Sequence, residues 1–496
     1  MESAAVTSES RTSELAGGSI GLSGAVVQSA ALIAPAVGAT AGFVFIAGQS
    51  GFAAPFAMIV GMVISLGVAV VIGDFARKVP AAGSFYNYLS AAFGPKTGFV
   101  TGFMLFGAYA LLLPFQLSFF ANYASSYFDV HSLSIAWQWW ALALIAVTTT
   151  LCVLGLSPSL KVGLIGLCFE VLVFGTVAIA VLVNGGATGL SLRPFDPSES
   201  ALGFSGIIYG LVFAIFAFVG FESSTTLGEE VREPRRTIPR AVLVTTVVIG
   251  IFYTLLMYIG VVGFGMTVPG LEALQSDGAP FNTLAENFVG TWLSTLVTIS
   301  VMTSFLALNI VTVTAAARMI YSMGRDRMLP GFLAHVNHRH APSRAALVVG
   351  IFGIAVTLIF GSLYSAEETA TWGSYIATLF FIVAYALLIV GVVRLYWNQY
   401  RDEFSYTRHV VVPLASLIGV GIVAYGNVHP TPPSPLRWFI WATLAVTLAS
   451  ALVAIWLERR DPEKLIQAGQ LFAAATPEEA DVRSDVEPIV PGGQAI

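Results

Sequence analysis

Twelve long runs of apolar residues divide most of this 496-residue chain, and they restrict its fold more than any other feature. A helix needs about 20 mostly apolar residues to cross a bilayer. The runs are continuous rather than alternating, which favours helices over a barrel, since a helix satisfies its own backbone hydrogen bonds in lipid. Charged residues make up 10% of the chain, against about 25% in soluble domains, so the apolar surface must face lipid. The sequence therefore predicts an all-α polytopic membrane protein with twelve transmembrane helices. The predicted spans lie near residues 19–46, 54–74, 98–125, 137–156, 160–183, 204–228, 240–266, 290–321, 344–364, 372–396, 408–427 and 437–457.

The regions outside these runs indicate how the chain is organised. Residues 1–18 are polar and lack the basic start and short apolar core of a signal peptide, so we expect a flexible tail. Residues 459–496 are polar and acidic and are expected to be disordered. Between the tails we predict a core of ten helices over residues 19–400 and two further helices over residues 401–458.

The positions of Lys and Arg between the runs predict the orientation. With a cytoplasmic N-terminus, the inner loops contain nearly all of these residues, and the outer loops contain only Arg193 and Arg437. This asymmetry follows the positive-inside rule. We therefore expect a multi-pass protein of the plasma membrane, embedded in the lipid bilayer, with both termini in the cytoplasm.

Several functional classes are disfavoured by the composition and by missing motifs. The net charge of -5 at pH 7 gives no basic face for nucleic acid. The sequence has no G-x-x-x-x-G-K-S/T loop, which argues against an ATP-driven pump. No group of His, Cys, Asp, Glu or Ser has catalytic or metal-ligand spacing, so we expect neither an enzyme nor a metal or organic cofactor.

Two of the runs contain interruptions, and they are the first and the sixth. The first contains Pro35, which removes a backbone hydrogen bond and disfavours helix in the preceding residue. The sixth contains residues 216–220, followed by the carboxylate of Glu222. Paired interruptions at corresponding positions of two five-helix repeats are typical of the binding site of an inverted-repeat transporter. An unwound segment offers carbonyls to an ammonium group, and a restarting helix offers amides to a carboxylate.

Four stretches of the chain resemble the amino acid–polyamine–organocation family of permeases. They are residues 28–38; residues 80–88 with 94–95; residues 218–222 running on to 241; and residues 318–321 with 325–326 and 329–330. The likeness covers about residues 15–400 and keeps the family's order and spacing. It implies a five-plus-five inverted-repeat fold with broken helices 1 and 6 and two extra helices. It also implies alternating access about a site in the middle of the membrane.

The resemblance further implies which residues bind substrate. Backbone amides of span one would hold a carboxylate, span six would hold the amine, and Phe216 would act as an aromatic gate. Members that bind amino acids commonly have a Gly-Ser-Gly-like segment where this chain has Gln28-Ser29-Ala30. Missing glycines make close backbone approach to a carboxylate less easy, so the Gln28 side chain is an alternative donor, and amines and polyamines stay open as substrates. The implied substrate-binding residues are Gln28, Ser29, Ala30, Ala31, Phe216, Ala217, Phe218 and Gly220.

Two carboxylates lie well inside apolar runs, Glu170 in the fifth and Glu222 in the sixth. A charge inside the membrane is costly and usually functional, so both are candidates for carrying a coupling proton. Glu222 could instead accept hydrogen bonds from freed amides, and Glu170 could instead pair with a cationic substrate. Thr303 and Ser304 could supply hydroxyls to sodium; we expect protons rather than sodium, and exchange without a coupling ion stays open.

A group of charged residues near the predicted inner face is a candidate cytoplasmic gate that breaks and re-forms during transport. Ordinary interfacial charges are the alternative interpretation. The residues are Asp74, Lys78, Glu229, Glu230, Arg236 and Arg318.

The interruptions and the resemblance together predict a secondary active transporter for amino acids or related amines, coupled to protons. One alternative is an importer or exchanger of amines or polyamines without carboxylate recognition. Another is a non-transporting amino-acid sensor with the same fold. The substrate, the direction of transport and the oligomeric state stay open.

Overall fold

The computed structural model describes residues 15, 17–130, 134–200 and 202–460. Regular structure within these ranges is helical, apart from one isolated parallel bridge between Ile20 and Val231. Twelve helical segments in the described part are long and apolar enough to cross a membrane. The predicted all-α polytopic fold with twelve spans is therefore confirmed. The predicted tails lie almost wholly outside the described residues.

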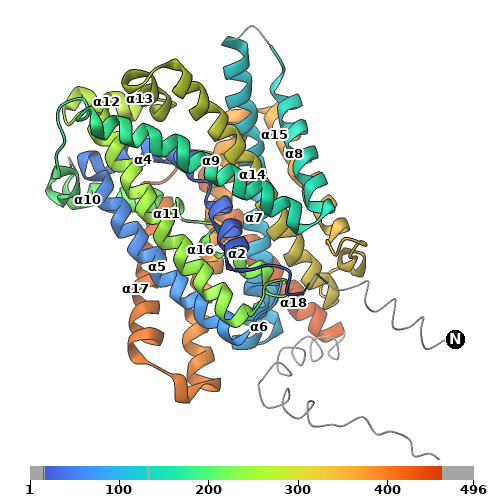
Figure 1. The fold of residues 1–496 in the computed structure, drawn as a ribbon. Helices are drawn as coiled ribbons and strands as arrows, with labels where there is room; N and C mark the ends of the chain where they lie inside the picture. Colours follow the sequence, from blue (N-terminus) through green and yellow to red (C-terminus); the bar gives the residue numbers. More distant parts are fainter. Residues whose placement is uncertain (1–14, 16, 131–133, 201, 461–496) are drawn as a thin grey trace, which may run out of the picture.

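The first half of the bundle contains five spans, the first of which is divided into short pieces (Figure 1). A π-helical turn, Gly38–Gly42, connects the second and third of these pieces. Pieces and spans are α2 (Leu22–Ile33), α3 (Pro35–Val37) and α4 (Phe43–Ser50), then α5 (Ala54–Lys78), α7 (Pro95–Val130), α8 (Trp137–Leu154) and α9 (Leu156–Val183), with the short α6 (Phe85–Phe93) before α7. At about 1.5 Å per residue, the 36 residues of α7 exceed the thickness of the hydrocarbon core, so this helix extends beyond the predicted 98–125.

The second half contains the remaining seven spans, and its first span is again interrupted. Two short helices between the seventh and eighth spans were not predicted, because they are too short to form an apolar run. Thr267 caps the first of them by accepting a hydrogen bond from the backbone of Gly270. The elements are α10 (Gly203–Phe216) with the 3-10 helix η5 (Phe221–Leu227), α11 (Pro234–Phe264), the short α12 (Val268–Ser276) and α13 (Pro280–Phe288), α14 (Thr291–Arg325), α15 (Ser343–Leu363), α16 (Ala366–Gln399), α17 (Val412–Val428) and α18 (Leu436–Arg460).

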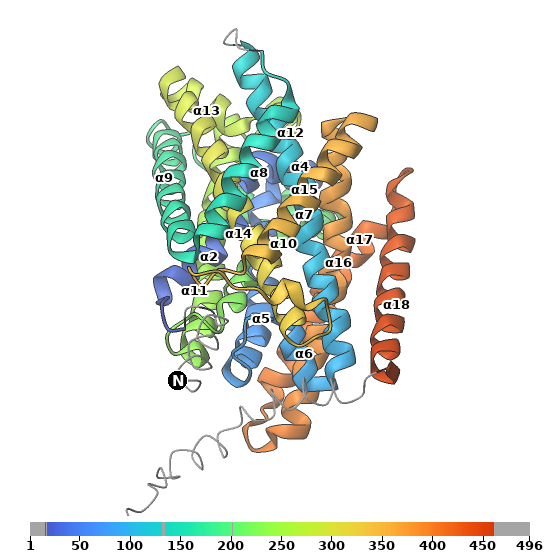
Figure 2. The same cartoon turned by 90° about the vertical axis from the view of Figure 1, so that its right-hand side faces the viewer.

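The first, third and eighth spans form the inside of the bundle. In each of them 72% of the most apolar stretch is buried by protein, against 17% in α18, which stands at the outer edge (Figure 2). The helix α7 packs along α16, α5 packs along α11, and α14 contacts both α7 and α9. The interrupted first span is therefore enclosed by other helices, where its unsatisfied backbone groups can find protein partners.

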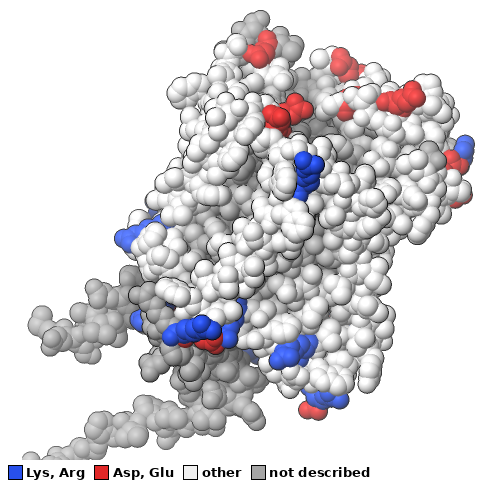
Figure 3. All heavy atoms as spheres, turned by 180° about the vertical axis from the view of Figure 1, so that it is seen from behind, with Lys and Arg blue, Asp and Glu red and all other residues white. Residues whose placement is uncertain are grey.

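The two ends of the bundle differ in charge. Figure 3 shows Asp and Glu gathered mostly towards one end of the visible face and Lys and Arg mostly towards the other. We name them the acidic end, where α12 and α13 lie, and the basic end, where α5 and α14 finish and α11 begins (Figure 1).

Candidate functional site

The first span breaks at Ala34, directly before Pro35. Ala34 has left-handed backbone angles, with φ 52° and ψ 73°, and it separates α2 from α3. Proline disfavours helical geometry in the residue before it and has no N–H to continue the ladder. The proline in this run therefore predicted the position of the break correctly.

Two buried side chains satisfy backbone groups that this break leaves free. Glu170 reaches from α9 and accepts a hydrogen bond from the backbone N–H of Ala36 at 3.0 Å. The hydroxyl of Tyr253, on α11, donates to the carbonyl of Ile33 at 3.2 Å. Ser304 of α14 lies beside the same carboxylate, whereas Thr303 bonds a carbonyl of its own helix. Glu170 thus acts as a cap for the restarting helix.

The sixth span breaks over the segment from Ala217 to Gly220. The helix α10 ends at Phe216, and two tight turns follow before the 3-10 helix η5 begins at Phe221. Gly220 has φ 117°, a conformation that residues with a side chain rarely adopt. A Cβ at this position would lie 2.9 Å from the carbonyl carbon of Leu32. Glycine here allows the two interrupted spans to approach closely.

Glu222 accepts a hydrogen bond from a backbone N–H at the second break, as Glu170 does at the first. Its Oε2 accepts hydrogen bonds from the backbone N–H of Gly220 at 2.9 Å and from the Tyr385 hydroxyl at 2.8 Å. Its Oε1 accepts from the Tyr109 hydroxyl at 2.7 Å. The carboxyl group is fully buried and ties the break to α7 and α16. This arrangement matches the alternative of a hydrogen-bond acceptor for freed amides; proton transfer by Glu222 stays a prediction.

Serine residues join the two interrupted spans directly. The hydroxyl of Ser29 donates to the carbonyl of Phe221 at 2.7 Å and accepts from the backbone N–H of Ser224 at 3.2 Å. The hydroxyl of Ser223 donates in turn to the carbonyl of Gln28 at 3.1 Å. The segment of α2 that the family resemblance selected therefore lies against η5, at the crossing of the two spans.

Two polar atoms at this crossing have no hydrogen-bond partner within the described part of the chain. They are the side-chain nitrogen Nε2 of Gln28 and the hydroxyl of Ser224. Both residues are at most 1% exposed. An unsatisfied buried donor is unfavourable by about 1–3 kcal/mol, so these atoms are the best-placed groups in the crossing to receive a polar ligand.

The expected backbone donors of span one lie inside a regular helix. The resemblance implied that Gln28, Ser29 and Ala30 offer backbone amides to a carboxylate, but these residues lie within α2, and the break follows at Ala34. The carbonyl of Ala30 is likewise occupied, by the N–H of Ala34. The reason is that Pro35, and not the position equivalent to the family's glycines, interrupts the ladder. Among residues 28–31, the Gln28 side chain is therefore the remaining donor, because the Ser29 hydroxyl donates to Phe221 and the alanine side chains carry no donor.

The predicted residues of span six occupy different surroundings. Phe216 ends α10 and is half-buried, and its role as an aromatic gate stays a prediction. Phe218 is fully buried and packs edge-on against Tyr253, with ring centroids 6.0 Å apart. Ala217 continues the helical geometry as the cap of α10. Their contact with a substrate stays a prediction.

A polar network on the inner face of α7 was not predicted. The side-chain amide of Gln116 donates to Thr312 at 2.8 Å, and its oxygen accepts from Asn309 at 2.9 Å. The hydroxyl of Thr148 then donates to the Asn309 oxygen at 3.0 Å. The network joins α7, α8 and α14. Its only signal in the sequence was the presence of Gln and Asn inside apolar runs.

Two ion pairs link α14 to the segment that follows η5 at the basic end, and we name these two ion pairs the closure. Arg318 of α14 binds both carboxylate oxygens of Glu230, at 2.6 and 3.0 Å, and both side chains are at most 5% exposed. Arg325 binds both oxygens of Glu229, at 2.8 and 2.9 Å. Burial raises the pKa of the Glu229 carboxyl, but the hydrogen bonds and charge of Arg325 outweigh it, and the net pKa is below the ordinary value. The N-terminal segment joins this closure, since the N–H of Ile20 donates to the carbonyl of Glu230 at 3.0 Å.

The other predicted gate residues do not belong to this cluster. Asp74 pairs with Arg408, at 2.6 Å, and Lys78 pairs with Glu403, also at 2.6 Å, so both bind the segment before α17. Arg236 is exposed and faces Glu233 of its own segment at 3.5 Å. The six predicted residues therefore form three separate groups. Of these six, Glu229, Glu230 and Arg318 take part in the two ion pairs between α14 and the segment after η5.

A helical bundle of twelve membrane-crossing segments, with two interrupted helices crossing inside it, defines a multi-pass membrane transporter. The family model described as amino acid permease matches residues 24–428. The chain belongs to the amino acid permease family, whose members are transporters and not enzymes, and the family resemblance is confirmed.

Three relatives illustrate the range within the family. The low-affinity putrescine importer PlaP of Escherichia coli is 24% identical over 79% of this chain and 84% of its own length. The branched-chain amino acid permease BcaP of Bacillus subtilis is 25% identical over 69% of this chain and 73% of its own. The chloroplastic cationic amino acid transporter 7 of Arabidopsis thaliana is 24% identical over 77% of this chain and 66% of its own.

Proposed function

We propose that this protein is a secondary transporter that carries amino acids or related amines by alternating access about the crossing of its two broken spans. The observation that carries the proposal is that crossing, where Ser29 of α2 binds Phe221 and Ser224 at the start of η5. Relatives named for putrescine, branched-chain and cationic amino acids support a substrate that bears an amine. The two buried or half-buried ion pairs at the basic end support a closure that must break for the site to open there.

In this proposal the Gln28 side chain supplies the donor that residues 28–31 cannot supply from the backbone. Its Nε2 is buried and unsatisfied, beside η5. A substrate carboxylate would accept a hydrogen bond from it, whereas a simple amine would not. Gln28 is therefore the main donor that we propose for a carboxylate, with the unsatisfied hydroxyl of Ser224 as a second, and amines without a carboxylate are the alternative substrates.

Ligand-induced thermal stabilisation of the purified protein tests both possibilities. A ligand that binds only the folded protein stabilises it by RT ln(1 + [L]/Kd). The panel pairs each amino acid with its decarboxylated amine and adds polyamines. We expect stabilisation by amino acids that is lost in Gln28→Met and kept in the control Gln275→Met, which alters a half-buried glutamine of α12. Stabilisation by amines alone, equal in both variants, would overturn the role of Gln28.

Flux measurements in liposomes test transport itself. The proposal predicts uptake of the stabilising ligand when a gradient of ligand or protons is applied. Binding without flux under any gradient would instead indicate a sensor with this fold, and would contradict the proposed function.

We propose protons as the coupling ion, carried by one of the two carboxylates that hold the breaks. A carboxyl group that caps a break can change its charge and alter the hydrogen bonds that fix the break. Glu222→Gln should flatten the pH dependence of uptake, whereas Glu272→Gln, at an exposed position of α12, should not. Unchanged pH dependence in both Glu222→Gln and Glu170→Gln, or a requirement for a sodium gradient, would exclude this mechanism.

The basic end is proposed to face the cytoplasm of a cell whose plasma membrane contains the protein. The positive-inside rule supports this orientation. A cysteine at Ser276 of α12 should react with a membrane-impermeant thiol reagent in intact cells, and a cysteine at Ser405 should react only after permeabilisation. The chain has two natural cysteines, Cys152 and Cys168, which are replaced first. The reverse labelling pattern would overturn the orientation.

A further inference from the structure

Glu170 is a buried carboxylate inside the membrane that has no cationic partner among the described residues. Its side chain reaches from α9 to the first break, where it accepts the hydrogen bond of Ala36, and the residue is 2% exposed. None of the ion pairs in the described part of the chain includes it. An ionised carboxylate in such surroundings is strongly unfavourable unless a proton or a counter-charge neutralises it. Glu170 therefore requires a proton or a cation that the described residues do not supply.

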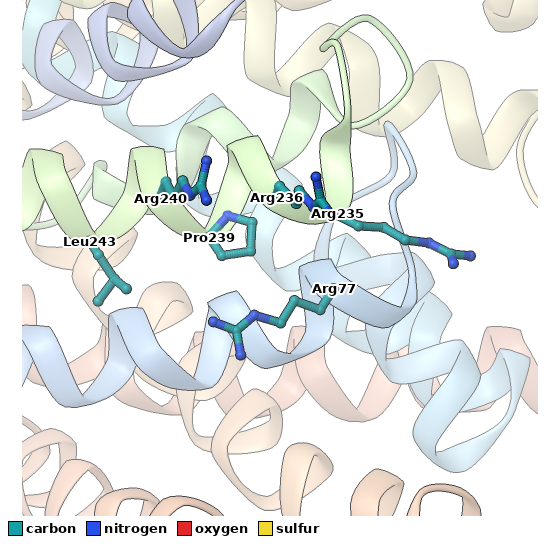
Figure 4. A pocket seen from close by; sticks show the side chains of 6 residues that line it. All are labelled: Arg77, Arg235, Arg236, Pro239, Arg240 and Leu243. Atoms are coloured by element: carbon teal, nitrogen blue, oxygen red, sulfur yellow. The ribbon is translucent and has the colours of Figure 1, made fainter. Parts of the chain in front are cut away.

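The cationic side chains of the helices around Glu170 lie towards the basic end. In α9, Lys161 precedes Glu170 by nine residues, about 14 Å along the helix axis, and is exposed. In α11, Arg240 precedes Tyr253, which contacts the same break, by 13 residues or about 20 Å. Figure 4 shows Arg240 at a separate pocket between α5 and α11. Arg318 of α14 belongs to the closure. These helices therefore bring no cation of their own to the carboxylate.

Two hydroxyl groups without hydrogen-bond partners lie on the side of α14 that faces this carboxylate. Ser304 lies beside Glu170, and Ser300 is one helical turn earlier on the same face. Both residues are fully buried, and neither hydroxyl has a partner within the described part of the chain. Thr303, between them, bonds a carbonyl of its own helix, as hydroxyls in helices commonly do. The helix thus leaves two buried hydroxyl oxygens unused next to Glu170.

A glycine leaves space in the seam between α9 and α14 next to these groups. Gly166 is one turn before Glu170, and a Cβ added there would lie 3.8 Å from the carbonyl oxygen of Thr303 and 3.9 Å from Ala307. These are ordinary van der Waals distances, so the seam has space for one more carbon atom. The contacts also show that this face of α9 packs on the part of α14 that contains Ser304.

The hydrogen-bonding capacity of these groups fits an ammonium group better than a proton. An ammonium group has three N–H donors, which match the carboxylate of Glu170 and the two hydroxyl oxygens. A proton on the carboxyl group supplies one O–H donor and leaves one of the two hydroxyls without it. An unsatisfied polar group is unfavourable when it is buried, so a cation with three donors satisfies more of this site.

We propose that Glu170 binds a second ammonium group of the transported substrate, with the hydroxyls of Ser300 and Ser304 as further acceptors. The inference rests on the proposed function and extends it by naming the substrate class, which is diamines and amino acids with a primary amine in the side chain. Of the two carboxylates at the breaks, this assignment leaves Glu222 to carry the coupling proton.

The distance from the crossing limits the shape of such a substrate. Ala36, whose N–H Glu170 binds, follows Gln28 by eight residues, or about 12 Å of helix. A substrate that contacts both Gln28 and Glu170 must carry its second ammonium group at the end of a flexible chain of several carbon atoms. Lysine, ornithine and 1,4-diaminobutane have this form.

Pairs of ligands that differ only in the second ammonium group test this inference by thermal stabilisation of the purified protein at constant ionic strength. The pairs are lysine with norleucine, ornithine with norvaline, and 1,4-diaminobutane with butylamine. In at least one pair, the ligand with two ammonium groups should give half-maximal stabilisation of the wild type at a concentration at least tenfold lower. Glu170→Gln, whose amide oxygen can still accept from Ala36, should reduce this ratio to below twofold.

Two controls separate the effect of the site from a general effect of substitution. Glu272→Gln, at an exposed position of α12, should keep the wild-type ratio. Ser304→Ala should lower the ratio at least threefold, whereas Thr303→Val, next to it on the same helix, should not. This second comparison decides the matter if Glu170→Gln does not fold.

The outcomes distinguish failure of this inference from failure of the proposed function. Equal concentrations for both members of every pair in the wild type would overturn the inference. A preference unchanged in Glu170→Gln, or in Ser304→Ala where Glu170→Gln does not fold, would also overturn it. In these cases stabilisation and uptake of norleucine, norvaline or butylamine would leave the proposed function in place. No stabilisation and no uptake of any member would overturn the proposed function and the inference with it.

Discussion

Replacing Gly220 by alanine should destabilise the crossing of the two broken spans. Two effects add. A residue with a side chain at φ 117° is strained by about 1–3 kcal/mol. The new Cβ would lie 2.9 Å from the carbonyl carbon of Leu32 and 3.0 Å from the backbone nitrogen of Ile33, and overpacking of this kind destabilises by about 1–3 kcal/mol. Backbone atoms cannot rotate away as a flexible side chain can, so we expect a total loss of about 2–6 kcal/mol.

Thermal unfolding in detergent measures the loss of stability, and uptake in liposomes measures its effect on transport. The control is Gly48→Ala, because Gly48 lies in α4 and a Cβ there would meet nothing within 4 Å. Alanine in a helix interior is favoured over glycine by about 0.5–1 kcal/mol, so the control should unfold no earlier than the wild type. Gly220→Ala should unfold several degrees earlier and transport poorly. If both variants unfold and transport like the wild type, the first and sixth spans do not approach each other closely at Gly220.

The closure at the basic end gives two further predictions. Glu230→Gln leaves the buried Arg318 without its counter-charge, so the free energy of unfolding should fall by about 3–5 kcal/mol. The control Glu233→Gln removes an exposed carboxylate and should leave the unfolding midpoint unchanged. Equal effects of the two substitutions on the unfolding midpoint would contradict the buried ion pair. The second prediction concerns pH. The folded-state pKa of Glu229 is lowered, so its ion pair stabilises above the unfolded pKa of about 4.3 and is lost as the pH falls through the folded pKa. Between about pH 5 and pH 3 the wild type should lose more stability than Arg325→Gln, and parallel losses would show that Arg325 does not hold this carboxyl group.

The number and kind of the spans could be predicted because lipid imposes one strong requirement on every segment that crosses it. An apolar run of sufficient length must be helical, whatever packs beside it. The same signal could not show α12 and α13, which cross nothing and have no long apolar run. It also could not give the full length of α7, which continues beyond the hydrocarbon core.

The position of the first break illustrates the difference between local chemistry and family likeness. Pro35 acts on its own neighbour, so the sequence alone predicted an interruption at Ala34. The family's glycine position corresponds to Gln28-Ser29-Ala30, but this chain has no glycine there to end the helix. Where this chain differs from the family's pattern, its own residues determine where the helix is interrupted.

The partners of the two carboxylates could not be predicted from sequence. Glu170 is separated by 134 residues from Ala36, whose amide it caps, and Glu222 by 163 residues from Tyr385. No periodicity records a contact between such distant positions. That both groups lie in apolar runs was visible, and their cost in lipid indicated a role; which break each one holds depends on tertiary packing.

The crossing and the closure are parts of one short segment. Glu222 lies at the start of η5, and Glu229 and Glu230 follow its end. A 3-10 helix rises about 2 Å per residue, so the seven residues of η5 span about 14 Å between the central carboxylate and the ion pairs. The segment is buried throughout and held at both ends, at one by tyrosines of α7 and α16 and at the other by arginines of α14. In the proposed function, a ligand that shifts Glu222 would therefore act on the ion pairs at the basic end through this short, enclosed segment. A stretch of 3-10 helix inside a span often marks a hinge, and η5 has the position and length to link occupancy of the crossing to opening of the basic end.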